Sequence, residues 1–352
     1  MDDIDGLPKV LLMGLKKSGK TSIQKVVFDN LPPHDSINLK TTVQPEKTTV
    51  KSNEFVKFEV WDFPGQSDPL GGSGAAGASG GNRSTIAANI LENCGAIVFV
   101  MDCTDNLEDA TKRLIETVCA AHAVNPDLCV EVFLHKVDAL NEVQQNDHLL
   151  QVRRSVEDVV KGRIDGKRQL RLSFNLTSIY DHSVFQAFSV VVQKLIRTQL
   201  PYVLELLGML NGNSQLDLTY LFLSRSKIFI GEVERNRTRT RTYDLCSDAI
   251  DVMMRVEGIY GGHLFAKKNL PQIKNSQQEG DASSAVGAHL ASSVFHLSSD
   301  DVIYVRELPN ELTVVMMLRD DAFQNKALID FNVNVFSNAV SEVFQAGSSN
   351  SR

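Results

Sequence analysis

The sequence predicts an α/β domain built on a mostly parallel sheet, followed by a second domain of the α+β class. Strand-like and helix-like segments alternate up to about Leu200, which is the pattern of a parallel sheet with helices on both faces. After Pro201 the strands come in runs, with helices at the ends and in the middle. The length of 352 residues also exceeds that of most single domains. We therefore expect a first domain over 1–200, a second over 201–346, and a disordered tail over 347–352.

Short apolar segments predict the strands of the first domain. Residues 96–102 form a continuous apolar run, which is typical of a strand buried on both faces of a parallel sheet. Further strands are predicted at 9–13, 55–61, 129–134 and 170–176. Helices are predicted at 20–28, 107–121, 147–160 and 183–195, where apolar residues recur at helical spacing.

The second domain has a different order of elements. Strands are predicted at 218–223, 227–230, 294–297, 302–307 and 312–318, and helices at 202–210, 243–256 and 320–344. Two segments are too rich in small and polar residues to bury a core. We expect the Gly-rich segment 71–81 to be a mobile loop and the Gln-, Ser-, Ala- and Gly-rich segment 269–293 to be a disordered insertion.

Composition excludes several classes of function. The formal net charge is -7, so a general nucleic-acid binder is not expected. No run of about 18 apolar residues occurs, so no direct insertion into a membrane is expected. The five cysteines include no Cys-x-x-Cys pair, and reduced thiols of this kind are typical of a cytoplasmic protein.

The strongest motif runs from Gly14 to Thr21 and fits the P-loop pattern G-x-x-x-x-G-K-[ST], between a predicted strand and a predicted helix. Backbone N–H groups of such a loop and the N-terminus of the helix bind phosphates. Lys20 would reach the β- and γ-phosphates as a catalytic cation, and the Thr21 hydroxyl would ligate Mg²⁺. The residues expected to bind the nucleotide here are Gly14, Lys16, Lys17, Ser18, Gly19, Lys20, Thr21 and Ser22.

A second motif, Asp-Phe-Pro-Gly-Gln at 62–66, follows a predicted strand. Asp62 is placed to hold Mg²⁺ through water, and the Gly65 N–H can hydrogen-bond a γ-phosphate. Gln66 stands where a Ras-type glutamine orients the attacking water, so it is the second candidate catalytic residue. This pattern predicts a loop that GTP orders and hydrolysis releases.

A third motif, His-Lys-Val-Asp at 135–138, ends a predicted buried strand, where ligands of open α/β sheets bind. The Asp138 carboxylate can accept from N1–H and the 2-amino group of guanine, and adenine lacks those donors. The Lys136 stem can stack along the base. Ser178 and Ile179 follow the next strand and could contact the base through backbone N–H groups, although Ser is also a common turn residue. Together with His135 they predict a site for GTP or GDP with Mg²⁺.

These residues together resemble the Rag GTPase family, in particular its C/D-type subunit, over nearly the whole chain. The resemblance is carried by segments 11–15, 22–28, 61–66, 132–138 and 176–183, with His in place of the usual Asn of the guanine motif. It implies a Ras-like domain followed by a roadblock-type domain. It also implies an obligate heterodimer with an A/B-type Rag subunit, paired through the roadblock domains. Such a pair signals amino-acid sufficiency to the TOR kinase complex, held peripherally at the vacuolar or lysosomal membrane by a membrane-anchored scaffold complex.

The resemblance further implies a switch loop between Leu31 and Val50 that carries a Mg²⁺-binding threonine. Thr42 has that position in the family pattern, and Thr41, Thr48 and Thr49 are the alternatives. The glycine-rich segment 71–81 is longer than the corresponding part of the family.

Three functions compete on these motifs. A GTP-hydrolysing switch is favoured by the complete motif set with Gln66. A scaffold subunit that holds its nucleotide with little turnover is favoured by Pro64 and the glycine-rich segment 71–81. A P-loop ATPase or small-molecule kinase is disfavoured by Asp138.

Lys17 and Ser18 carry side chains where the phosphate loop approaches the γ-phosphate. One hypothesis is that both crowd the space that an inserted arginine finger would use. The alternative is that both point into solvent.

Overall fold

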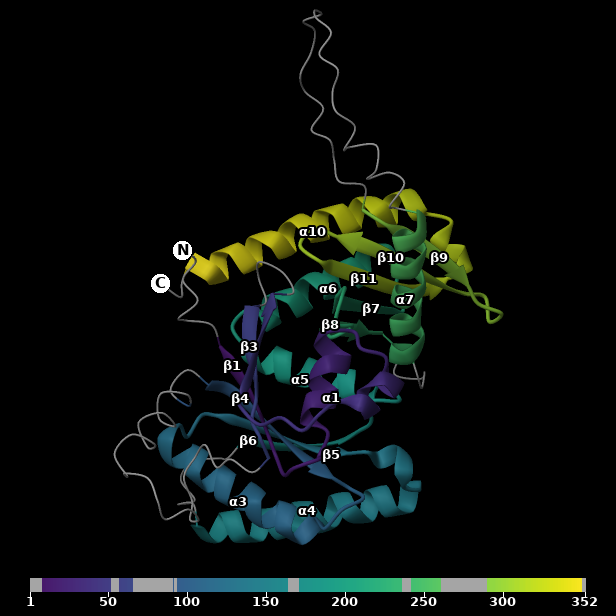
Figure 1. Ribbon diagram of the computed structural model, residues 1–352. Coiled ribbons are helices and arrows are strands. Elements are labelled where there is room, and N and C mark those ends of the chain that lie inside the picture. The colour runs from purple at the N-terminus through teal and green to yellow at the C-terminus, as the bar shows by residue number, and fades with distance from the viewer. Residues whose placement is uncertain are drawn as a thin grey trace, which may run out of the picture. The chain divides into compact units, whose positions relative to one another are not determined.

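The computed structural model describes residues 8–51, 57–65, 91, 94–163, 171–235, 242–260 and 290–349. The chain divides into two compact units, Met1–Leu200 and Pro201–Arg352 (Figure 1).

The first unit is built on a six-stranded sheet in the order β2-β3-β1-β4-β5-β6. Its strands are β1 (Lys9–Met13), β2 (Glu46–Lys51), β3 (Lys57–Asp62), β4 (Cys94–Asp102), β5 (Cys129–His135) and β6 (Arg171–Thr177). All neighbouring pairs are parallel except β2 and β3, which are antiparallel. The predicted α/β class is therefore confirmed, and the carboxyl ends of the parallel strands meet at one edge.

Helices cover both faces of this sheet (Figure 1). They are α1 (Lys20–Phe28) and α5 (Ser183–Leu195) on one face, and α3 (Leu107–Val124) and α4 (Glu142–Arg163) on the other. Alternation along β1 sends Leu11 toward α3 and α4, where it shares a buried cluster with Leu114 and Val152. On the opposite face the Phe188 ring lies edge-on to the rings of Phe28 and Phe133, each at 5.3 Å.

Some features of this unit were not predicted. Helix α4 begins at Glu142 rather than at residue 147, because Asn141 and Gln144 form a reciprocal cap. The Asn141 side chain accepts from the Gln144 N–H at 2.9 Å, and the Gln144 side chain accepts from the Asn141 N–H at 3.2 Å. A short 3₁₀ helix (Pro33–Asn38) and strand β2 also lie in the segment expected to be a switch loop.

The second unit is built on an antiparallel five-stranded sheet in the order β8-β7-β11-β10-β9. The strands are β7 (Leu218–Leu223), β8 (Phe229–Glu234), β9 (Ser292–His296), β10 (Asp301–Leu308) and β11 (Leu312–Arg319). The helices are α6 (Leu200–Ser214), α7 (Thr242–Tyr260), α9 (Asp320–Phe323) and α10 (Lys326–Ser349). The unit has the α+β architecture of a roadblock-type domain.

Contacts across the second sheet assign its helices to opposite faces. The Thr219 hydroxyl donates to Asn211 of α6, and the Tyr304 hydroxyl donates to Asp330 of α10 at 2.6 Å. Thr219 and Tyr304 are both in register with Met316, so α6 and α10 cover the same face. Tyr220, one residue further along β7, packs on Tyr243 of α7 on the other face.

Three predictions for the second unit were wrong in detail. The single helix predicted at 320–344 is divided between α9 and α10, which lets Phe323 pack on the Tyr304 ring at 5.6 Å before α10 starts. Strand β9 starts at Ser292, inside the segment 269–293 that was expected to be disordered. Helix α10 extends to Ser349, inside the expected disordered tail. The expected loop at 71–81 and residues 269–289 and 350–352 lie outside the described residues. None of the described helices is long and apolar enough to cross a membrane.

Candidate nucleotide-binding site

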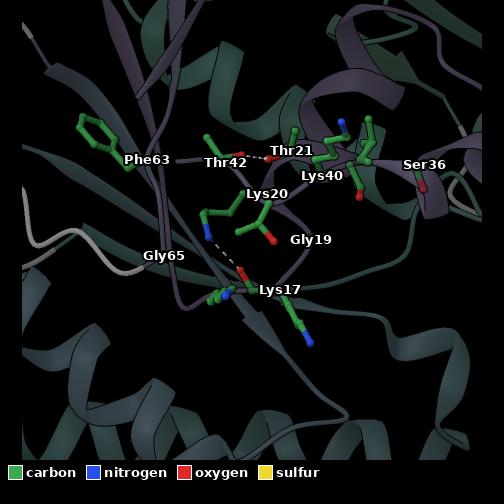
Figure 2. Close-up of a pocket in the computed structure, with 14 residues that line it drawn as sticks. Lys17, Gly19, Lys20, Thr21, Ser36, Lys40, Thr42, Phe63 and Gly65 are labelled. Carbon is green, nitrogen blue, oxygen red and sulfur yellow. Dashed lines mark hydrogen bonds between the residues drawn. The ribbon is translucent and has the colours of Figure 1, made fainter. Parts of the chain in front are cut away.

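A pocket opens at the carboxyl edge of the first sheet, where β1 leads into α1 (Figure 2). The P-loop forms its floor. The segment around Ser36 and the chain from Leu39 to Thr42 form one wall, and Phe63 and Gly65 form another. The predicted P-loop residues from Lys16 to Ser22 all line this single pocket, as nucleotide binding requires.

Lys20 is buried at the centre of the P-loop. Its Nζ donates to the carbonyl oxygens of Gly14 at 3.0 Å and Leu15 at 2.8 Å, which fixes the ammonium against the loop. The pKa of Lys20 is lowered to about 8, because burial outweighs the opposing effect of the negative charge of Asp62. A lowered pKa means that burial destabilises the charged ammonium, and a nearby anion would stabilise it. Lys20 is therefore suited to bind phosphate oxygens.

Ser18 and Lys17 differ in orientation. The Ser18 side chain is buried, and its hydroxyl lies 3.4 Å from the Lys20 Nζ. Ser18 therefore lines the pocket without pointing into solvent, contrary to the alternative. Lys17 is exposed and has a left-handed φ of 65°. Lys17 and the exposed Lys16 also line the pocket.

Three oxygen-bearing side chains converge beside Lys20. The Thr21 hydroxyl lies 2.8 Å from the Thr42 hydroxyl (Figure 2). It also donates to Asp62, and the Thr42 hydroxyl lies 3.3 Å from the same Asp62 oxygen. Thr48, an alternative to Thr42, instead accepts from Gln24 at 2.5 Å. The structure thus brings Thr42, rather than Thr48, to the two other candidate metal ligands.

The donor chemistry of this cluster fits Mg²⁺. Asp62 is fully buried, and its Oδ1 atom has no hydrogen-bond partner among the described residues. Burial raises the pKa of Asp62, while the Thr21 and Thr42 hydroxyls and Lys20 lower it in part. Two hydroxyls and a carboxylate are the hard oxygen ligands that Mg²⁺ prefers, and an orphaned carboxylate oxygen gains a partner from a cation or its water. Thr21, Thr42 and Asp62 would hold the ion.

Gly65 presses closely on the P-loop. A Cβ atom at this position would lie 2.2 Å from the backbone N of Lys16, so no larger residue fits. This contact places the Gly65 backbone next to the loop that would hold the γ-phosphate. Gln66 lies outside the described residues, and its catalytic role stays a prediction.

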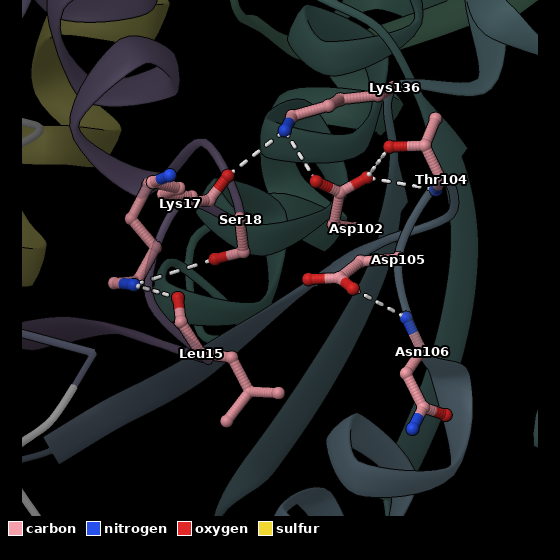
Figure 3. A network of polar contacts seen from close by, with 9 residues as sticks. Leu15, Lys17, Ser18, Asp102, Thr104, Asp105, Asn106 and Lys136 are labelled. Atoms are coloured by element: carbon pink, nitrogen blue, oxygen red, sulfur yellow. Dashed lines mark hydrogen bonds and ion pairs between the residues drawn. The ribbon is translucent and has the colours of Figure 1, made fainter.

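The predicted base motif forms a connected set at the ends of β5 and β6. The Ser178 hydroxyl donates to Asp138 Oδ1 at 2.5 Å, which orients the carboxylate. Lys136 has a left-handed φ of 63°, and its Nζ donates to the Lys17 carbonyl oxygen at 2.9 Å (Figure 3). The His135 imidazole lies beneath Gly19 of the P-loop. For Ile179 the structure shows only a half-buried position beside Ser178.

Asp102 belongs to this set and was missed by the sequence analysis. It ends β4 opposite His135, and its carboxylate forms an ion pair with Lys136 (Figure 3). Burial raises its pKa, but the Lys136 ammonium and the Thr104 N–H and hydroxyl outweigh burial, so the pKa is lowered overall. A polar residue that ends a continuous apolar strand at the carboxyl edge is the signal that could have identified it.

We predict that Asp102→Asn accelerates the release of bound GDP about tenfold, because Lys136 loses the charged partner that aims it at the P-loop. Release of a fluorescent GDP analogue from the loaded protein measures this. Asp105→Asn is the matched control, because exposed Asp105 accepts from the Asn106 N–H at 2.8 Å rather than from Lys136 (Figure 3). Equal release rates in the two variants would show that Asp102 does not support the loop.

The fold and the site together define a Ras-like P-loop GTPase domain followed by a smaller α+β domain. The model of the Gtr1/RagA G protein conserved region matches residues 9–250, and the chain belongs to this family. It is 37% identical to Ras-related GTP-binding protein C of Mus musculus over 342 residues, which cover 97% of this chain and 78% of the relative. It is 36% identical to GTP-binding protein gtr2 of Schizosaccharomyces pombe over 337 residues, covering 96% and 98% of the two chains.

Similarity to an A-type protein is weaker and shorter. Ras-related GTP-binding protein A of Dictyostelium discoideum is 25% identical over 193 residues, which cover 53% of this chain and 58% of the relative. The similarity therefore extends over nearly the whole chain toward C-type and gtr2 relatives and over about half of it toward this A-type relative, and the resemblance to the C/D type is confirmed. The chain is a GTPase of the Rag family.

Proposed function

We propose that this chain is a GTP-hydrolysing switch and the C/D-type subunit of a Rag heterodimer, which signals amino-acid sufficiency to the TOR kinase complex. The observation that supports the switch most directly is the contact of Thr42 with Thr21 and Asp62. Thr42 belongs to the segment between α1 and β2, so this segment is held by the residues that would bind phosphate and Mg²⁺.

Each residue of the site has a separate role in nucleotide binding and hydrolysis. Lys20 and the N-terminus of α1 bind the β- and γ-phosphates and stabilise the negative charge that develops during transfer. Bound Mg²⁺ would neutralise phosphate charge further. Gln66 orients the attacking water. Asp138 and Ser178 select guanine, and Lys136 fastens the base motif to the P-loop. Loss of the γ-phosphate weakens the hold on Thr42 and Gly65 and releases the switch segments.

The nucleotide content of the purified full-length chain tests this proposal, followed over time after loading with GTP. We expect guanine nucleotide that converts slowly to GDP, and we expect Gln66→Leu to stop the conversion. GTP that persists unchanged in the unmodified protein would instead favour a scaffold subunit with little turnover. Adenine nucleotide, or none, would contradict the assignment of Asp138.

The second unit supplies a surface for the proposed A/B-type partner. Helix α7 exposes an apolar stripe, and strand β9 is the edge of the sheet beside it. The stripe consists of Leu245, Val252, Val256 and Ile259, with exposed fractions of 45%, 47%, 47% and 67%. An apolar helix face next to an open strand edge is suited to pair with a second domain of the same kind.

We predict that Val256→Asp weakens pairing with an A/B-type Rag subunit at least roughly 100-fold, because it places a charge in an apolar contact. Co-purification and analytical ultracentrifugation of the two subunits measure this. Phe331→Asp on α10 is the matched control, since Phe331 is 65% exposed but on the other face of the sheet. Loss of pairing in Phe331→Asp but not in Val256→Asp would show that the interface involves α10 instead of α7.

The proposed place of action is the cytoplasmic side of the vacuolar or lysosomal membrane. The pair would be held there by a membrane-anchored scaffold complex. Localisation of the chain in cells with and without that scaffold tests this part of the proposal, and retention at the membrane without it would contradict the proposal.

A further inference from the structure

The His135 imidazole is buried between two strand ends and the P-loop. It ends β5 directly opposite Thr177, which ends β6, and both side chains are 1% exposed or less. The His135 Nδ1 atom lies 3.1 Å from the Thr177 hydroxyl oxygen, and that hydroxyl lies 3.4 Å from the Leu134 carbonyl oxygen.

These two contacts select one tautomer of the ring. A hydroxyl has a single proton, and a carbonyl oxygen can only accept a hydrogen bond. The Thr177 hydroxyl therefore donates to the Leu134 carbonyl oxygen and accepts from His135 Nδ1–H. The neutral ring then carries its proton on Nδ1, and Nε2 keeps a lone pair.

The other edge of the ring touches the P-loop at Gly19. A Cβ atom on Gly19 would lie 2.7 Å from His135 Cδ2 and 3.0 Å from Nε2. Gly19 has a φ of 100°, and its carbonyl oxygen accepts the first hydrogen bond of α1, from the Ile23 N–H at 2.9 Å. The imidazole thus supports the backbone at the point where the P-loop turns into the helix that carries Lys20.

We propose that His135 is a positioning residue for the nucleotide, whose neutral imidazole supports the P-loop at Gly19 and so sets how long the protein retains bound nucleotide. This inference rests on the proposed function, because it requires guanine nucleotide at the P-loop. The support of the P-loop by a neutral His135 also makes the retention of nucleotide sensitive to acid.

Burial, together with the neighbouring Lys136 ammonium, lowers the pKa of His135 to about 4. Asp138, Asp102 and the backbone of Thr177 oppose this shift in part. The two lysine ammonium groups nearest to this part of the P-loop form contacts of their own. Lys136 is directed to Asp102 and the Lys17 carbonyl oxygen, and Lys20 to the Gly14 and Leu15 carbonyl oxygens.

The direction of the acid effect follows from the two pKa values. With the loop in place the ring titrates near 4, and once the loop has moved away it regains a value near 6.5. Between these values the displaced state binds more protons than the supported state. Falling pH therefore favours the displaced loop, and nucleotide release accelerates.

Release of a fluorescent GDP analogue from the loaded full-length protein, at pH values from 4.5 to 8, tests the proposal. For the unmodified protein we expect release to be flat above about pH 7 and to accelerate roughly tenfold between pH 6.5 and 5. His135→Asn should lose this acceleration. Its release at pH 7.5 should lie between that of the unmodified protein and that of His135→Leu, because an amide can still donate to Thr177. His135→Leu should release about tenfold faster at pH 7.5.

Two further variants separate positioning from folding. Thr177→Val removes the partner of Nδ1 without touching the ring, and should accelerate release at pH 7.5 severalfold. His148→Asn on α4 makes the same substitution outside the site, and should keep the acid acceleration. Circular dichroism at each pH confirms that the release rates belong to folded protein.

An unchanged acid acceleration in His135→Asn would overturn the proposal, because another group would then be titrating. Release rates of Thr177→Val and His135→Leu that equal those of the unmodified protein would overturn it as well. Failure of the unmodified protein to retain guanine nucleotide at pH 7.5 would overturn the proposed function itself. A protein that retains nucleotide with a rate independent of pH and of residue 135 would overturn only the role of His135.

Discussion

Lys20→Met is expected to reduce the affinity for GTP and GDP by at least roughly 100-fold, which corresponds to about 3 kcal/mol. The ammonium is the buried cation at the floor of the pocket, and burial already lowers its pKa to about 8. A methionine leaves the phosphates without this charge and the Gly14 and Leu15 carbonyl oxygens without their donor. Titration of the nucleotide-free protein with a fluorescent GDP analogue measures the loss.

Lys25→Met is the matched control on the same helix. Lys25 is partly exposed and forms an ion pair with Asp29 at 3.2 Å, outside the pocket. We expect it to change the affinity less than about threefold, as for an exposed ion pair. A similar loss in both variants would mean that the charge of α1, and not the position of Lys20, controls binding.

Asp138→Asn is expected to reduce GTP affinity by about 1000-fold and to raise the affinity for xanthosine triphosphate. The carboxylate accepts from two donors of guanine, and an amide can accept from only one and turns a donor toward the other. Xanthine has an oxygen in place of the 2-amino group, so the same amide suits it. Competition between the two nucleotides for the purified variant measures the exchange of specificity.

Asp181→Asn is the control for this substitution. Asp181 is exposed and accepts from the Ser183 N–H at 2.9 Å, in the loop that also orders Ser178. It should weaken GTP binding less than about fivefold and give no gain for xanthine. A gain for xanthine in Asp181→Asn, or none in Asp138→Asn, would show that Asp138 does not read the base.

The regular elements followed closely from local sequence. Strand β1, helix α1 and helix α5 have the predicted bounds, because each is a short periodic segment between clear breaks. Errors occurred where a cap or a tertiary contact sets the end of an element. The reciprocal cap of Asn141 and Gln144 starts α4 early, and packing of Phe323 separates α9 from α10.

The site was predictable in its motifs and not in its connections. The sequence by itself determined the P-loop, the Asp62 motif and the guanine motif, because phosphate, metal and base chemistry require particular residues at fixed local spacing. Only the tertiary structure decided that Thr42 rather than Thr48 meets Thr21, that Ser18 is buried, that Asp102 holds Lys136, and that His135 supports Gly19. These pairs lie far apart in the chain or depend on side-chain direction. Sheet register and packing set such contacts, and local spacing does not encode them.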